Sequence, residues 1–287
     1  PPPNPPPPPP LPPPRPPPPP RTPERIRHHY EVEKELAVRM RASTRTDRME
    51  LFKTLYTELF ERVPDHPRLT RRETPEASEQ KVAGQMRLLR PFLSKESVVL
   101  EFAPGDCRLA SAVARETRKV YGVDISDQRA VNEESPPNLE LIVYDGYELG
   151  LSPAGADVVF SYQFVEHLHP EDVDPHFTLA RRMLKPGGVY VLDTPHRHSG
   201  PHDVSRYFGD TLECFHFQEW TYRDMRRLLL KNGFSKTAML RFGKPRYSRL
   251  ANWMNDMVES CLGLLPRKMR QRASARLFQS VAIIAWA

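Results

Sequence analysis

The feature that most constrains the fold is a series of short apolar runs, each bounded by turn residues and separated from the next by a helical pattern. A run that is apolar at nearly every position fits a strand covered on both faces. Strands that alternate with helices predict an α/β fold, a doubly wound, Rossmann-like and mostly parallel sheet. We expect the first five strands at 98–102, 119–124, 139–144, 157–161 and 189–193.

The last part of the chain departs from this alternation. A helical pattern at 222–232 ends at Gly233, a strand follows at 235–241, and another closes the chain at 280–286. Residues 245–277 between them read as a helical insertion. We expect the two late strands to pair antiparallel at one edge, which gives a seven-stranded sheet with an antiparallel edge strand.

Residues 1–23 differ from everything after them, because they hold 18 of the 33 prolines. Proline fixes φ and lacks an N–H donor, so an extended polyproline tail is expected. The tail reads either as a spacer or as a ligand for an SH3-like partner, since PxxP motifs surround Arg15 and Arg21. Residues 24–79 then form a helical N-terminal extension that packs on a main domain at 80–287.

The net charge of +6 is concentrated at one end of the chain. Residues 241–287 carry nine basic and two acidic side chains, so the rest is close to neutral. A near-neutral body argues against a nucleic-acid partner. Three separated cysteines without a CxxC motif favour a reducing, cytoplasmic compartment, and no apolar run is long enough to span a bilayer.

Small and acidic residues follow the first three expected strands, where ligands of doubly wound folds bind. The turn from Glu101 to Gly105 lets a ligand approach the backbone. Asp124 follows 23 residues after Glu101 and can accept both hydroxyls of a ribose. Asp145 can accept a hydrogen bond from an adenine amino group. One such acid is commonly a solvated loop residue or a helix cap, but three in this order are a stronger signal.

With these residues the sequence resembles class I S-adenosylmethionine-dependent methyltransferases of the type 11-like group, over roughly residues 80–287. Glu101–Gly105 matches the first motif of that family, 157–168 matches the fourth strand and the segment after it, and Leu184–Gly188 matches the turn before the fifth strand. The resemblance implies S-adenosylmethionine as cofactor. The residues it assigns to cofactor binding are Glu101, Phe102, Ala103, Gly105, Asp124, Ile125, Asp145, Gly146 and Tyr162.

The first motif departs from the family's G-x-G-x-G pattern. Ala103 and Cys107 replace the first and third glycines. Alanine adds one methyl group near the cofactor, and Cys107 predicts either a shifted loop or a sulfur that faces the next helix. The dinucleotide fingerprint G-x-G-x-x-G is also absent, which argues against a nicotinamide-dependent oxidoreductase.

Histidines gather after the fourth and fifth strands. In the family that the sequence resembles, the loop at 193–207 faces the methyl group, and an alcohol acceptor needs a base there. We take His167, His198 and His202 as candidate catalytic residues. A solvated polar loop is the simplest alternative for this segment. A metal site is a further alternative, and we assign no metal ligands; its residues would be His196, His198, His202 and Asp203.

The acceptor is predicted in class only. Residues 161–164 lack the D/N-P-P-Y motif of enzymes that methylate base amino groups, which favours a small molecule over DNA. An apolar helical stripe at 249–265 precedes five basic residues at 267–276. This stripe either packs on the domain or, through 249–276, contacts an anionic membrane surface next to a lipid- or sugar-linked acceptor. The alternative function is a non-catalytic scaffold that keeps the fold and recruits partners through its tail.

Overall fold

The computed structural model describes residues 21–70, 75–129, 135–241, 244–246, 248–278 and 280–287. Most of the predicted polyproline tail, residues 1–20, lies outside these ranges. The described chain contains an eight-stranded sheet. Its strands are β1 Val98–Phe102, β2 Lys119–Asp124, β3 Leu139–Val143, β4 Ala156–Tyr162, β5 Leu184–Thr194, β6 Lys236–Arg241, β7 Lys244–Arg246 and β8 Val281–Trp286.

The strand order β3-β2-β1-β4-β5-β8-β6-β7 confirms the doubly wound fold. Strands β1 to β5 pair in parallel, with Val99 opposite both Val120 and Val158. Strand β8 runs antiparallel to both β5 and β6, so the predicted pairing of the two late strands is confirmed. The antiparallel strand β8 lies inside the sheet, however, because β6 and β7 continue beyond it.

The prediction of seven strands was wrong by one. Strand β7 pairs antiparallel with β6 at the sheet edge, with Pro245 opposite Leu240. Its sequence, Lys-Pro-Arg, is exposed at all three positions and contains none of the β-branched residues that signal a strand. Proline is tolerated on an edge strand, where its missing donor faces solvent. The helical part of the insertion therefore begins later than predicted, with α8 Arg249–Gly263 and α9 Arg267–Leu277.

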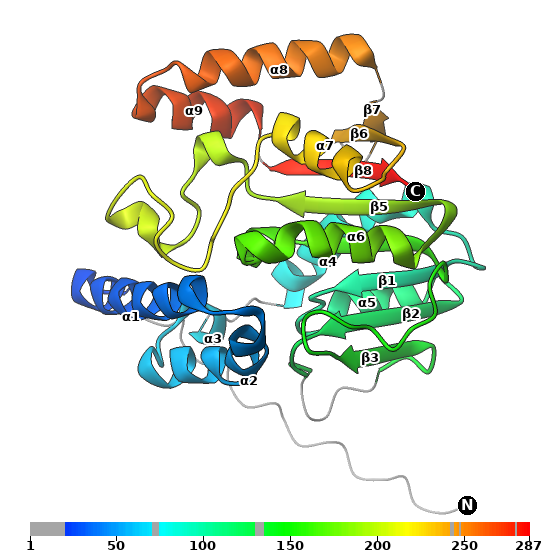
Figure 1. Cartoon of the computed structure of the whole chain (residues 1–287), viewed down its shortest axis with the longest axis horizontal. Helices are drawn as coiled ribbons and strands as arrows, with labels where there is room; N and C mark the ends of the chain where they lie inside the picture. Colours follow the sequence, from blue (N-terminus) through cyan, green and yellow to red (C-terminus); the bar gives the residue numbers. More distant parts are fainter. Residues whose placement is uncertain (1–20, 71–74, 130–134, 242–243, 247, 279) are drawn as a thin grey trace, which may run out of the picture.

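Helices cover both faces of the sheet (Figure 1). Helices α6 Val173–Met183 and α7 Tyr222–Lys231 pack on one face, and α4 Pro75–Leu89 and α5 Arg108–Ala114 on the other. Side chains alternate along each strand, so Leu100 and Phe102 enter the first core while Val99 enters the second. Short 3₁₀ helices lie at Arg90–Phe92, Val165–His167, Pro170–Asp172, Arg197–Ser199 and Val204–Tyr207.

The N-terminal extension forms three helices, α1 Pro23–Ala42, α2 Arg45–Arg62 and α3 Pro67–Thr70, which lie beyond the carboxyl ends of the parallel strands (Figure 1). Thr22 caps α1, and Thr44 forms a capping box with Asp47 at the start of α2. The buried faces of α1 and α2 enclose Phe215 of the main domain. The predicted packing of the extension on the domain is confirmed.

One buried arginine joins the extension to the main domain. The side chain of Arg48 on α2 is 1% exposed and lies 2.9 Å from a carboxylate oxygen of Asp172 and 2.9 Å from one of Glu171. It also donates to the Tyr147 hydroxyl at 3.1 Å and to the Ser43 carbonyl at 2.6 Å. Each of the three guanidinium nitrogens therefore has an acceptor, and these contacts hold α2 against the main domain.

Helix α8 turns its apolar stripe outward. Leu250 and Trp253 are 65% and 59% exposed, whereas Asn255 and Glu259 are buried. The interpretation that this stripe packs on the domain is therefore wrong for most of its residues, although Leu262 is buried. None of the helices in the described ranges is both long and apolar enough to cross a membrane.

Candidate functional site

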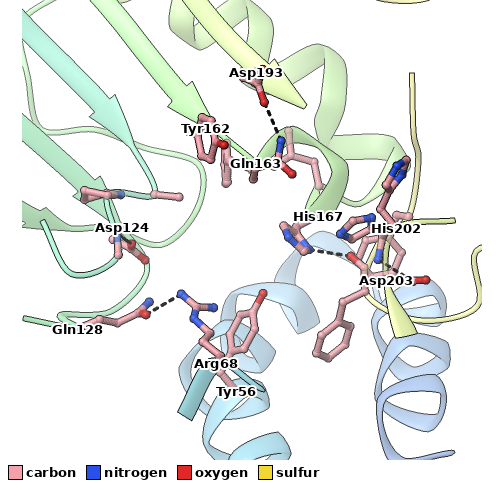
Figure 2. A pocket seen from close by; sticks show the side chains of 18 of the residues that line it. Tyr56, Arg68, Asp124, Gln128, Tyr162, Gln163, His167, Asp193, His202 and Asp203 are labelled. Atoms are coloured by element: carbon pink, nitrogen blue, oxygen red, sulfur yellow. Dashed lines mark hydrogen bonds between the residues drawn. The ribbon is translucent and has the colours of Figure 1, made fainter. Parts of the chain in front are cut away.

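A cavity of about 2470 Å³ lies beyond the carboxyl ends of the parallel strands and is roofed by the N-terminal extension. Figure 2 shows Asp124 on one side of it and His167 and His202 on the other. We call the first side the strand-tip end, made of Glu101, Ala103–Gly105 and Asp124. We call the second the histidine end, made of His167, His202 and His216.

Asp124 ends β2 and is held by backbone donors. Its Oδ1 accepts from the Ile125 N–H at 2.8 Å, and its Oδ2 accepts from the Gly105 N–H at 3.3 Å. Burial raises the pKa of this carboxyl, while these backbone hydrogen bonds lower it. The carboxylate is thus oriented toward the loop between β1 and α5, where a ligand hydroxyl can reach it.

Glu101 on β1 is 5% exposed and borders the same end of the cavity. Burial, together with the neighbouring charges of Asp106 and Asp124, raises the pKa of Glu101 to about 8. Two buried acids side by side repel one another when both are ionised. The strand-tip end therefore favours a ligand that carries positive charge.

The backbone of the loop after β1 adopts the left-handed conformation, with positive φ, at three positions. Ala103, Gly105 and Cys107 have φ of 54°, 57° and 59°. Only glycine adopts this conformation without strain, so the family's glycines would fit all three positions. The Cys107 side chain is buried in the core that also holds Leu109 of α5, and burial raises the pKa of its thiol to about 12. Of the two interpretations of Cys107, the sulfur that faces the helix is the one that matches this packing.

Most predicted cofactor residues line the cavity: Glu101, Ala103, Gly105, Asp124, Ile125, Gly146 and Tyr162. Two predicted residues do not. Phe102 is fully buried in the core, 6.2 Å from the Phe164 ring, because strand alternation turns it away from the site. Asp145 does not border the cavity either, and its Oδ1 accepts from the Tyr147 and Glu148 N–H groups of its own loop.

The extension supplies residues that the sequence did not reveal. Arg68 of α3 donates to the Gln128 side chain at 2.7 Å and lies over the Tyr56 ring, closing the strand-tip end (Figure 2). Phe52 of α2 lies so close to Gly146, φ 92°, that a Cβ there would be 2.7 Å from its ring. A single sequence offers no signal for the contacts of Arg68 with Gln128 and of Phe52 with Gly146, because these residues are 60 and 94 positions apart.

At the histidine end, His167 follows β4 and is oriented by the backbone. Its Nδ1 lies 2.9 Å from the Phe215 carbonyl oxygen, so Nδ1 donates and Nε2 keeps its lone pair. Burial and the nearby His216 lower the pKa of His167 to about 3. The ring is therefore neutral at pH 7.

His202 and His216 share one buried acid, Glu219. His216 Nδ1 bonds Glu219 Oε1 at 2.9 Å, and His202 Nδ1 lies 3.1 Å from Oε2, an ion-pair distance without a well-aligned hydrogen bond. Burial alone would raise the pKa of Glu219, but the two histidines lower it to about 2. Sequence analysis missed His216 and Glu219; their three-residue spacing was the available signal.

His198 and His196 lie away from the cavity. His196 is fully buried, 3.0 Å from Glu259 of α8, and stacks on Phe278. His198 lies beside it against Gly263 and does not border the cavity, unlike His167 and His202. The metal set proposed from the 196–203 loop is not among the ligand groups that converge in the described ranges.

Comparisons with known proteins show what a part of this chain is similar to. Residues 100–192 match a family described as a methyltransferase domain. A probable S-adenosylmethionine-dependent methyltransferase of Mycolicibacterium smegmatis is 30% identical over 137 residues, which cover 47% of this chain and 51% of that protein. A protein of Mycobacterium tuberculosis with the same description is 29% identical over 142 residues, 49% of this chain and 50% of that protein. The chain thus spans about half the length of these curated relatives.

The fold also resembles that of a solved structure. A methyltransferase bound to the Trm112 activator of Haloferax volcanii superposes with a TM-score of 0.51 at 15% identity, over 73% of this chain and 91% of that one. At this identity the likeness concerns the fold alone.

Proposed function

We propose that the chain is an S-adenosylmethionine-dependent methyltransferase, because residues 100–192 match a methyltransferase-domain family and the curated relatives carry that description. We further propose that it transfers the methyl group to a hydroxyl of a small, lipid-linked molecule. The observation that carries this proposal is one cavity that joins the strand-tip end to the histidine end. A donor held at one end then meets an acceptor held at the other, which is the alignment that methyl transfer requires.

The strand-tip end suits the donor. S-adenosylmethionine supplies a methyl group on a positively charged sulfur. Glu101, whose pKa is raised to about 8, gains from a nearby cation because ionisation then costs less. Asp124, oriented by the Gly105 and Ile125 N–H groups, would accept the ribose hydroxyls.

The histidine end suits a hydroxyl acceptor. His202 borders the cavity, and Glu219 lies on its Nδ1 side, which leaves Nε2 to take the hydroxyl proton as the methyl group moves from sulfur to oxygen. The Glu219 carboxylate, 3.1 Å from Nδ1, stabilises the imidazolium that forms. We assign the general base to His202 for this reason.

Two features favour a lipid-linked acceptor. The extension lines the cavity with apolar side chains of α2, including Leu55, Leu59 and Phe60. The outward apolar stripe of α8 adjoins the basic residues of α9, and Arg276 at the end of α9 borders the cavity. An apolar surface flanked by cations fits an anionic bilayer, from which an acceptor would enter.

Turnover with a radiolabelled methyl donor tests the activity. We expect label in the organic phase when the chain is incubated with a lipid extract of its source cells, and none with the aqueous extract. His202→Asn should lower the rate about 100-fold or more while S-adenosylhomocysteine still binds, and the exposed control His28→Asn should not. Label confined to aqueous products would refute the lipid-linked acceptor.

Vesicle sedimentation tests the membrane surface separately. The double variant Trp253→Ser, Met254→Ser should lose most binding to phosphatidylglycerol vesicles, and salt should weaken binding by the intact chain. Leu230→Ser, which removes an exposed leucine from α7, is the matched control. Equal binding by all three proteins would count against this surface.

The scaffold alternative rests on one observation, the left-handed non-glycine residues Ala103 and Cys107 in the first motif. In that case S-adenosylhomocysteine would not bind, no extract would be labelled, and deletion of residues 1–20 would abolish capture by an SH3-like domain. Calorimetry with S-adenosylhomocysteine separates the two functions.

A further inference from the structure

We propose that Glu166, His167 and His216 form a binding site for a divalent first-row transition metal at the histidine end. One ligand atom from each of the three lies within 4.8 Å of the other two. His167 and His216 border the cavity, and Glu166 lies behind them, fully buried. The proposal concerns metal binding and does not depend on methyl transfer.

Both histidines have a partner on Nδ1 that orients the ring and leaves the other nitrogen available to a metal ion. His167 Nδ1 donates to the Phe215 carbonyl at 2.9 Å, and His216 Nδ1 contacts Glu219 Oε1 at 2.9 Å. In each ring Nδ1 is thereby engaged, so Nε2 is the nitrogen that is left to bind an ion. Histidine ligands of metals are typically held in this way, by a carbonyl or a carboxylate on the opposite nitrogen.

Glu166 supplies an independent indication of a missing ligand. Its Oε2 accepts from the Thr194 hydroxyl at 2.9 Å, but its Oε1 is buried and has no hydrogen-bond partner among the residues described. An unpaired buried carboxylate oxygen is costly. A metal ion beside it would remove that cost.

The three ligands sit on segments that are fixed to each other. The Phe217 N–H donates to the Glu166 carbonyl at 2.8 Å, which joins residues 215–217 to the turn that carries Glu166 and His167. The two imidazole rings meet edge to face, with centroids 4.9 Å apart. A preorganised set of this kind loses little freedom when an ion binds.

Two other clusters bring three possible ligand residues together but fit less well. In the group of His29, Glu33 and His66, both nitrogens of His29 already contact Arg21 and Glu33. In the group of Glu33, Asp203 and Cys214, burial raises the pKa of the thiol to about 12, so thiolate is disfavoured.

The donor set indicates the kind of ion. Two imidazoles and one carboxylate suit Zn²⁺, Fe²⁺ or Co²⁺ rather than the oxygen-seeking Ca²⁺ and Mg²⁺. Three protein ligands leave coordination positions open toward the cavity. An acceptor oxygen could occupy one of them, so the site would orient the acceptor.

Cobalt titration of the full chain after treatment with a chelator tests the site. We expect one Co²⁺ per chain with visible absorption bands, and at least tenfold weaker binding for the isosteric Glu166→Gln and for His216→Gln. His28→Gln on the surface and His29→Gln in the adjacent cluster should bind as the unmodified chain does. Zinc should raise Tm of the unmodified chain and not that of Glu166→Gln.

Unchanged cobalt binding in Glu166→Gln and His216→Gln would overturn the proposal. So would loss of binding in His29→Gln alone, or a sulfur-to-cobalt charge-transfer band, since either places the ion in another cluster. If circular dichroism shows that His216→Gln does not fold, the zinc shift of Glu166→Gln decides. Absence of any cobalt or zinc binding by the folded chain would also refute the site.

Discussion

The two ends of the cavity are built in different ways. The strand-tip end comes from the ends of β1 and β2, and backbone N–H groups orient its main carboxylate. The histidine end comes from the turn after β4, the loop at 202–203 and the segment at 216–219, packed against the N-terminal extension. The difference teaches that the carboxylate of the strand-tip end is oriented by local backbone contacts and only covered by the extension, while the histidine end is assembled by long-range packing.

The largest expected effect concerns the long-range end. Arg48→Met should lower the free energy of unfolding by about 3–5 kcal/mol, because it leaves Asp172 buried without its partner. Urea unfolding measures the change. The affinity for S-adenosylhomocysteine, measured on folded protein, should stay within twofold if the two ends are separable.

The control for Arg48 lies on the same helix. Lys53→Met removes an exposed ion pair with Glu50 and should cost less than about 0.5 kcal/mol. A comparable loss in both variants, or a loss of less than about 1 kcal/mol in Arg48→Met, would show that Arg48 does not hold the extension in place.

The difference between the two ends explains which site residues could be predicted from the sequence. Glu101, Gly105 and Asp124 were found because each lies at a fixed place after an apolar strand, and the parallel sheet brings those places together. The sequence position of Asp145 did not show that this residue would lie outside the cavity lining, with its carboxylate bonded to its own loop.

The histidine end was predicted only in part. His167 and His202 were named from their strands, but the partner Glu219 lies on a segment with no strand pattern before it. His202 borders the cavity, whereas His198 lies against Gly263 of α8, a contact that the loop sequence does not reveal. Arg68 and Phe52 reach the cavity through packing of the extension, which no local pattern encodes.

A second prediction concerns protons at the strand-tip end. Glu101, with its pKa raised to about 8, is mostly protonated at pH 7 and should ionise when a cation binds. Binding of S-adenosylmethionine should therefore release about one proton near pH 7, and affinity should rise with pH until it levels off above pH 8. Calorimetry in two buffers of different ionisation enthalpy measures the release.

Glu101→Gln is the matching variant, because it keeps the shape of the side chain and removes the group that ionises. It should abolish the release and flatten the pH dependence. The raised pKa of Glu101 also affects folding. Because the folded chain binds this proton more tightly than the unfolded chain, the ligand-free fold loses stability as pH rises from about 4.5 to 8. Proton release that persists in Glu101→Gln would assign it to another group.

The smallest effect concerns the left-handed loop. Ala103→Gly should stabilise the chain by about 0.5 kcal/mol, because relief at φ 54° slightly exceeds the entropy that glycine costs. Ala112→Gly in α5 should instead destabilise it by about 0.5–1 kcal/mol. Thermal unfolding compares the two variants. A change in stability of the same sign in both would contradict the strain at Ala103.

The central claim is that the ends of β1 and β2 hold an adenosine whose ribose bonds Asp124. Calorimetry of S-adenosylhomocysteine with Asp124→Asn tests it most directly, beside Asp127→Asn, which removes an exposed acid three residues away. We predict at least about tenfold weaker binding for Asp124→Asn and an unchanged affinity for Asp127→Asn. Equal affinities for the two variants and the unmodified chain would contradict the account.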